Sequence, residues 1–120
     1  MIYFTSDQHL GHPAIISMQK RPFRDVGDMN RTIINNFNSM VHKDDTVSLN
    51  GRCFALMHYP MLSWPKSNHG SYQLHGHIHA KKDYNLQNRL DAVRRYDVGV
   101  DANNFYPVSV EQIICFFEDM

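Results

Sequence analysis

The chain has 120 residues, of which 42% are hydrophobic, and its 12 Lys and Arg balance its 12 Asp and Glu. This length allows one domain and is too short for two, and the apolar content supports a packed core over disorder. With equal numbers of basic and acidic residues, the chain is not expected to have the extended basic surface of a protein that coats nucleic acid. No segment has the features of a signal peptide or the ~20 apolar residues of a membrane helix, so we expect no membrane association and a cytoplasmic location.

The first predicted elements are a short strand and a long helix. Residues 2–5 form an apolar, β-favouring run that stops at Ser6, so the strand delivers Asp7 and His9 into a loop. Residues 28–41 repeat apolar side chains at helical spacing, with Asp28 as the expected N-cap.

Further short strands and a terminal helix follow. The strands are expected at residues 46–49, 53–57, 72–74 and 95–100. Asn50-Gly51 favours a hairpin turn between the first two of these. Ser109 and Gln112 match a capping box at the start of a helix over residues 110–118.

The two cysteines predict no disulfide framework. Cys53 and Cys115 have no regular spacing, and both lie in apolar runs. This context favours buried, reduced thiols.

Histidine is unusually abundant, with eight residues in the chain. Several lie just after predicted strands: His9 with Asp7 after the first, His58 after the run at 53–57, and a cluster at 75, 77 and 79 after the run at 72–74. Binding groups gather where strands end and loops begin. Carboxylate and imidazole are usual ligands of Zn, Mn and Fe, so the pattern predicts a metal site, and phosphoester hydrolysis suits such a ligand set.

Each of these motifs has a structural alternative. A lone Asp-x-His is more often a loop aspartate that caps a helix, and His58 before Tyr-Pro fits a turn histidine bonded to backbone. Three histidines in five residues rarely arise from packing, so the cluster at 75–79 favours a metal or phosphate role. His42 and His69 lie in polar, turn-like surroundings and are expected at the surface.

Taken in order, these motifs resemble the calcineurin-like metallophosphoesterases. The resembling segments are SDQHLGH after the strand at 2–5, HYP after the strand at 53–57 and HGHIHA after the strand at 72–74. The closing DVGVDANNFYPVS resembles the end of small bacterial and phage members of that family. The resemblance implies an α/β (α+β) fold in which two β-sheets pack as a sandwich with flanking helices, over a single domain at 1–120.

The resemblance also implies roles for individual residues. Asp7, His9 and His79 would bind a first metal, His58 and His77 a second, and His12 would lie near the substrate phosphate. The metal would be a divalent transition ion such as Mn, Zn, Fe or Ni. The substrate would be a phosphoester small molecule or a nucleotide.

The chain also departs from the family pattern. It lacks counterparts of the Gly-Asp motif, whose aspartate bridges the two metals, and of the Gly-Asn-His motif, which supplies a second-metal ligand and a catalytic histidine. A deletion near residues 48–50 would explain both losses, and it would leave a sheet edge that must be covered or paired. We therefore expect one metal site rather than two.

Three functions remain open from the sequence. The first is hydrolysis of phosphate mono- or diesters by metal-activated water, with impaired turnover. The alternative is a non-catalytic, metal-binding remnant of a metallophosphoesterase. A structural zinc module is disfavoured because such sites are usually rich in cysteine.

Overall fold

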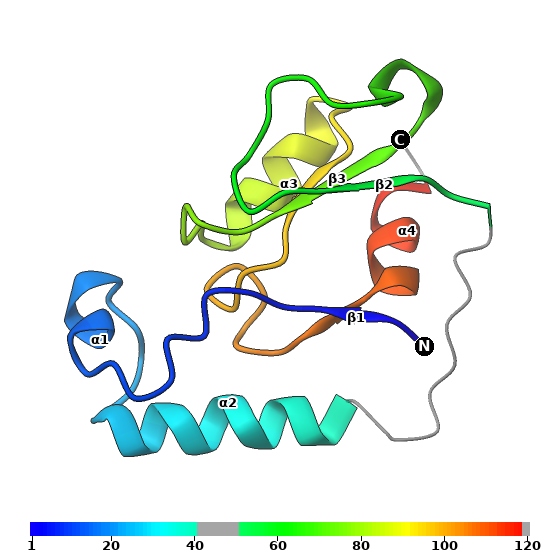
Figure 1. Cartoon of the computed structure of the whole chain (residues 1–120). Coiled ribbons are helices and arrows are strands. Elements are labelled where there is room, and N and C mark those ends of the chain that lie inside the picture. The colour runs from blue at the N-terminus through cyan, green and yellow to red at the C-terminus, as the bar shows by residue number, and fades with distance from the viewer. Residues whose placement is uncertain (41–50, 119–120) are drawn as a thin grey trace.

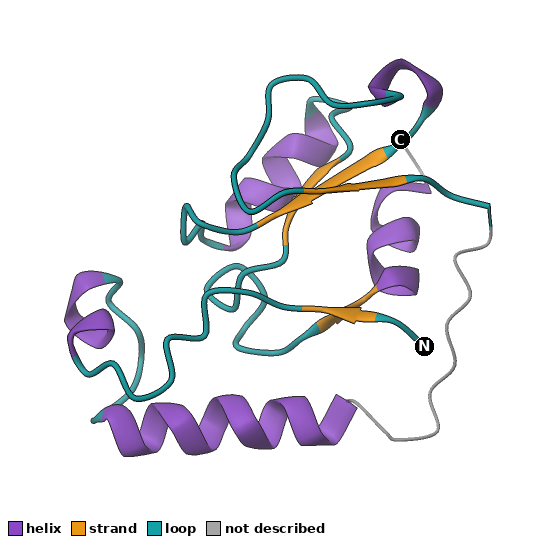
Figure 2. Ribbon diagram, in the orientation of Figure 1, coloured by secondary structure: helices purple, strands orange, loops and turns teal. Residues whose placement is uncertain are grey.

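The computed structural model describes residues 1–40 and 51–118. In this part of the chain the fold is mixed α/β, with two small sheets and four α-helices (Figures 1 and 2). The helices are α1 (Ala14–Met18), α2 (Val26–Met40), α3 (Lys82–Leu90) and α4 (Val110–Glu118), and a short 3₁₀ helix spans Ser67–His69. None of the described helices has the length and apolar character needed to cross a bilayer.

The larger sheet is parallel, in the order β2 (Phe54–Leu56), β3 (Tyr72–His75), β4 (Arg95–Asp97). The smaller sheet pairs β1 (Tyr3–Phe4) with β5 (Val108–Ser109) in antiparallel register. A single parallel bridge between Ser6 and Gly99 joins the segment after β1 to the segment after β4. As a result, the chain leaves β1, β2, β3 and β4 at neighbouring points, where binding groups tend to collect in α/β folds.

The two faces of the parallel sheet differ in chemistry because successive side chains on a strand alternate. Tyr72, Leu74 and Tyr96 are buried in one core cluster with the apolar face of α4, which includes Ile113 and Phe117. This cluster is the main hydrophobic core of the described chain.

The opposite face of the sheet is polar and packs against α3. The Asn85 side chain accepts from the Asp97 N–H at 2.7 Å and donates to the Asp97 carbonyl at 3.0 Å. Arg95 Nη2 donates to Asn88 Oδ1 at 3.1 Å. Helix α3 is therefore attached to the sheet largely by hydrogen bonds rather than by an apolar stripe.

A second, smaller core holds the N-terminal helices. Ile15, Met29 and Ile33 are buried together, and Phe23 and Phe105 pack against them with ring centroids 4.7 Å apart. This cluster packs α1 and α2 against Phe105, in the loop that follows β4.

Most predicted elements are confirmed, with shifted ends. The expected strands at 2–5, 53–57 and 72–74 correspond to β1, β2 and β3. The predicted strand at 95–100 is too long: β4 ends at Asp97, whose Oδ1 accepts the Gly99 N–H at 2.7 Å, a local bond that competes with strand pairing. The expected strand at 46–49, its hairpin and His42 lie outside the described residues.

Both helix caps were tested by the structure. The capping box of α4 is confirmed: the Ser109 N–H donates to Gln112 Oε1 at 2.8 Å, and the Gln112 N–H donates to Ser109 Oγ at 3.1 Å. The expected N-cap of α2 at Asp28 is wrong. The helix begins at Val26, and Asp25 caps it by accepting the Asp28 N–H at 2.7 Å.

The expected burial of the thiols is also wrong. Cys53 and Cys115 are free but exposed. The helical period of α4 turns Ile113, Ile114 and Phe117 inward and leaves position 115 outside, and Cys53 precedes a strand at the end of the sheet order.

Candidate metal centre

The five sequence-predicted ligands lie at the ends of three strands and face a common region. Asp7 and His9 follow β1, His58 follows β2, and His77 and His79 follow β3. Within the described residues, Asp7, His9 and His79 offer ligand atoms that all lie within 4.8 Å of one another. These are the three residues assigned to the first metal from the sequence.

The two oxygens of the Asp7 carboxylate have different surroundings. Oδ2 accepts hydrogen bonds from Ser6 Oγ at 2.7 Å and from the His77 N–H at 2.9 Å. Oδ1 faces two imidazoles, with His58 Nε2 at 3.9 Å and His79 Nε2 at 4.0 Å. One oxygen is therefore used to orient the carboxylate, and the other is directed at the histidines.

These contacts also set the charge of Asp7. Burial raises the pKa of its carboxyl, but the hydrogen bonds from Ser6 and the His77 amide, with attraction to His79 and His58, outweigh burial and lower the pKa below 3.8. The side chain is consequently an anion at neutral pH, as a metal ligand must be.

The surroundings of His9 favour the neutral form of its imidazole. Burial lowers the pKa of its imidazole, and repulsion from His79 and Arg21 acts in the same direction. Its ring centroid lies 5.1 Å from that of His79. A neutral imidazole offers a free lone pair, which a protonated ring cannot.

The orientation of His79 is set by a buried carboxylate. His79 Nδ1 lies 2.8 Å from Asp101 Oδ2, and because a carboxylate only accepts, Nδ1 carries the proton. Nε2 is then the ring nitrogen left to bind a metal, and this is the atom that faces Asp7 Oδ1. An imidazole held in this way by a carboxylate is the usual arrangement behind a metal-binding histidine.

The second predicted pair, His58 and His77, lies beside the first group. Their ring centroids are 5.2 Å apart, and the Tyr59 ring packs edge-on against His77 at 4.4 Å. Both histidines are exposed. His58 and His77 therefore lie next to each other, although they follow different strands.

His12 lies at the outer side of the group. Its Nδ1 is 3.4 Å from His9 Nδ1, and its side chain is exposed. From this position it is accessible to a molecule that approaches the site from solvent.

His75 has a structural environment, unlike the other two histidines of its cluster. It is only 1% exposed; its Nδ1 donates to the Gly76 carbonyl at 2.9 Å, and its Nε2 accepts from the Tyr84 hydroxyl at 3.1 Å. Burial lowers the pKa of the ring, which is consistent with a neutral, doubly bonded imidazole. His69 is exposed, as expected from the sequence.

The backbone of the site is held in an uncommon conformation. Asp7, His9, His77 and His79 have φ values of 57°, 53°, 72° and 48°, in the left-handed region. Such residues cost on the order of 1 kcal/mol or more each and tend to cluster at functional sites, where surrounding contacts hold them.

Gly76 permits the close approach of the loops after β1 and β3. A Cβ at this position would collide with Ser6 Oγ and Asp7 Oδ2. Since its φ is not in the left-handed region, the requirement is for space and not for backbone freedom.

Sequence reasoning missed three residues of the site: Ser6, Arg21 and Asp101. Ser6 and Asp101 lie within two of the segments that carry the resemblance, SDQHLGH and DVGVDANNFYPVS, and their polar side chains there were the available signal. Arg21 had none, because it lies 80 positions from its partner Asp101 in the sequence.

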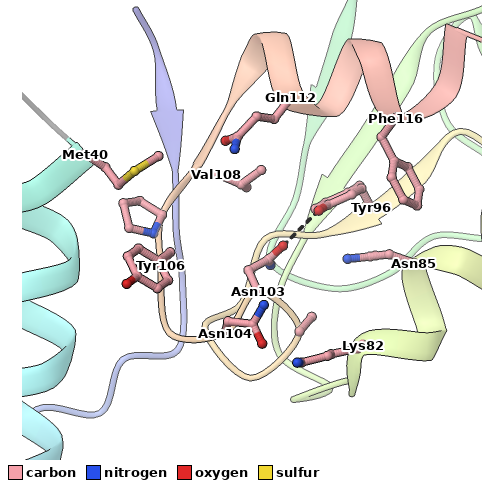
Figure 3. Close-up of a pocket in the computed structure, with 12 residues that line it drawn as sticks. Met40, Lys82, Asn85, Tyr96, Asn103, Asn104, Tyr106, Val108, Gln112 and Phe116 are labelled. Atoms are coloured by element: carbon pink, nitrogen blue, oxygen red, sulfur yellow. Dashed lines mark hydrogen bonds between the residues drawn. The ribbon is translucent and has the colours of Figure 1, made fainter.

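A separate cavity of about 520 Å³ lies away from the predicted ligands, none of which lines it. Figure 3 shows Met40, Tyr96, Asn103 and Phe116 around it, with the Tyr96 hydroxyl donating to Asn103 Oδ1 at 2.8 Å. Burial raises the pKa of Tyr96 to about 12. Because this cavity gathers no pair of acid and base or metal-type side chains, the candidate site remains the histidine group.

Comparison with known proteins gives one informative similarity. No family model and no solved structure matches the chain. An uncharacterized protein of Methanocaldococcus jannaschii is 27% identical over 168 residues, which span 98% of this chain and 91% of that protein. Since this chain has 120 residues, at least 48 of those 168 aligned positions have no counterpart in it.

Proposed function

We propose that the chain is a metallophosphoesterase-like protein that binds a divalent transition metal through Asp7, His9 and His79. The observation that carries the proposal is the convergence of one carboxylate and two imidazoles within 4.8 Å. This donor set fits Mn, Zn, Fe or Ni, and two histidines with one carboxylate leave coordination positions open. The order and context of the motifs, which resemble the calcineurin-like metallophosphoesterases, supply the reaction class.

The reaction would be hydrolysis of a phosphate mono- or diester. A bound divalent metal would supply Lewis-acid stabilisation and a more acidic water. The chain's own contribution is to hold an anionic Asp7 and the imidazoles of His9 and His79 in place. His12 would contact the phosphate from the solvent side, because its ring is exposed and its Nδ1 lies 3.4 Å from Nδ1 of His9.

Impaired turnover is part of the proposal. The chain's Gly27-Asp28 dipeptide lies in the first turn of α2, where the Asp28 carboxylate accepts the Arg24 N–H at 3.1 Å, so it does not replace a bridging aspartate at the site. Loss of acid–base assistance alone typically costs ~10²–10⁴-fold in rate. We therefore expect turnover far below that of complete relatives.

A segment lost from the ancestral chain is supported by two observations. The archaeal relative has at least 48 aligned positions that this 120-residue chain lacks. A cavity of about 290 Å³, lined by Phe4, Leu56 and Met57, lies next to His58 and Gly76. An apolar cavity between β1 and β2 is what removal of intervening strands from a two-sheet sandwich would leave.

The loss also favours a second candidate function, a metal-binding remnant without catalysis. This candidate shares the metal site and differs only in turnover. Both readings place the first metal at the same three side chains.

Hydrolysis of bis(4-nitrophenyl) phosphate after loading with Mn²⁺, Zn²⁺, Fe²⁺ or Ni²⁺ separates the two candidates. The phosphoesterase predicts slow, metal-dependent release of nitrophenol that His79→Ala abolishes and that exposed His69→Ala leaves unchanged. Metal binding with no hydrolysis above the His79→Ala background would establish the remnant instead. No metal binding at all would contradict both.

A further inference from the structure

Arg21 is buried where it contacts both the loop of Asp7 and His9 and the carboxylate of Asp101. It lies between α1 and α2, and its side chain is 0% exposed. A fully buried guanidinium is rare unless every donor has a partner, so its contacts indicate what it holds together.

One part of the guanidinium binds the loop of Asp7 and His9. Nη2 donates to the Asp7 carbonyl at 2.6 Å, and Nη1 donates to the Gln8 carbonyl at 2.8 Å. These two carbonyls belong to the stretch in which Asp7 and His9 have left-handed backbone. The bonds therefore stabilise the loop in the conformation that presents both side chains.

The other part binds the residue that orients His79. Nε donates to Asp101 Oδ1 at 2.9 Å, and Nη2 donates to Asp101 Oδ2 at 2.8 Å. Asp101 Oδ2 is the same oxygen that accepts from His79 Nδ1 at 2.8 Å. The bidentate pair thus fixes the plane of the carboxylate and, through it, the ring of His79.

We propose that Arg21 is the positioning residue of the metal centre. It sets the placement of Asp7, His9 and His79 relative to one another because it binds the loop of Asp7 and His9 and, at the same time, Asp101, the residue that orients His79. The inference rests on the proposed metal site and adds to it a residue that contacts no ligand atom. Lysine cannot replace it, since an ammonium is a single point charge without the planar fork of donors.

The test uses Arg21→Lys, with Arg24→Lys as the matched control because the Arg24 side chain is 80% exposed. Affinity is measured with Zn²⁺ and Co²⁺ by competition with a chelating dye, and the visible absorption of the Co²⁺ form reports its coordination. Loss of a residue behind metal ligands typically weakens metal binding ~10–100-fold. We expect this loss and a changed Co²⁺ spectrum for Arg21→Lys, with neither change for Arg24→Lys.

Buried Arg21 also stabilises the fold, so a second variant is needed in case Arg21→Lys is unfolded. Arg21→Met with Asp101→Leu replaces the buried ion pair by apolar side chains, an exchange that proteins often tolerate. This double variant should have the circular dichroism of the wild type and the same loss of metal affinity. Wild-type affinity in a folded variant of either kind would overturn the inference.

A metal-free measurement keeps this inference distinct from the proposed function. ¹⁵N chemical shifts report the His79 tautomer, and hydrogen exchange reports how strongly the backbone amides of residues 7–9 are protected from solvent. Both should change in the folded Arg21 variants and stay unchanged in Arg24→Lys. If the wild type binds no metal, the proposed function fails, but a changed tautomer and faster exchange still support the role of Arg21. An unchanged tautomer with unchanged exchange contradicts it.

Discussion

The Oδ1 atom of Asp7 lies 3.9 Å from Nε2 of His58. The same oxygen lies 4.0 Å from Nε2 of His79, so the carboxylate stands between the His9–His79 pair and the His58–His77 pair. Asp7 is therefore a carboxylate that both histidine pairs can share.

Asp7→Asn should therefore weaken metal binding more than loss of a histidine from the His58–His77 pair. The neutral amide removes the negative charge and leaves one weak oxygen ligand. Calorimetric titration with Zn²⁺ of Asp7→Asn, His58→Ala and the wild type checks this order. Exposed Asp83→Asn on α3 is the charge-matched control, and equal affinities for Asp7→Asn and the wild type would refute the role of the carboxylate.

Gly76→Ala should disrupt the site through steric overlap alone. A new Cβ would collide with Ser6 Oγ and Asp7 Oδ2, and overpacking of this kind typically costs about 1–3 kcal/mol. We expect a lower free energy of unfolding in urea and weaker metal binding.

Gly27→Ala is the control for this substitution. Its Cβ would meet only the ends of the Asp25 and Arg31 side chains, at 3.3 and 3.4 Å. If Gly76→Ala had the same free energy of unfolding and the same metal affinity as Gly27→Ala, the close approach of the loops after β1 and β3 would not matter for the site.

Ser6→Ala should raise the pKa of Asp7 toward its ordinary value of 3.8, because the Ser6 hydroxyl donates one of the hydrogen bonds that lower it. In the folded wild type this pKa lies below that of the unfolded chain. The ionised carboxylate therefore stabilises the fold above the unfolded pKa, and this contribution is lost as pH falls through the folded pKa.

A ¹³C NMR titration of metal-free protein measures the pKa directly. The difference in unfolding free energy between wild type and Ser6→Ala should be present at neutral pH and shrink in acid. Exposed Ser17→Ala, which removes only a bond to the Ala14 carbonyl, should leave the Asp7 titration unchanged. An identical titration in Ser6→Ala would exclude the hydrogen bond as a cause.

The elements with local chemical signals were predictable from the sequence. The capping box of α4 is complete within four residues, and the strands β1, β2 and β3 are short apolar runs that end in polar motifs. Helix α3 was missed because its buried side chains include Asn85 and Asn88, which bond to the sheet and give no apolar periodicity.

The residues of the candidate site also fall into two groups, those that the sequence indicated and those that it did not. Its candidate ligands carry a recognisable residue type at strand ends and could be named from the sequence. Arg21 could not, because its role arises from hydrogen bonds to Asp101, which lies 80 positions away in the sequence. Long-range polar contacts of this kind leave no local spacing to detect.

Ser109→Ala tests the locally encoded part of the fold. Loss of the hydroxyl that accepts the Gln112 N–H should lower the free energy of unfolding by about 1 kcal/mol, a typical value for an N-cap serine. The exposed Ser39→Ala, whose hydroxyl donates only to the Asn36 carbonyl, is the control in the same urea titrations. Equal stability of the two variants would show that the capping box contributes little.

The metal content of the purified chain tests the central claim most directly. After loading with Zn²⁺ or Mn²⁺ and mild dialysis, elemental analysis should find about one ion per chain in the wild type and in His69→Ala. His79→Ala should retain much less, because it removes one of three ligands whose donor atoms lie within 4.8 Å of one another. A wild-type chain that stays metal-free, with a stability that neither added metal nor chelator changes, would contradict the account.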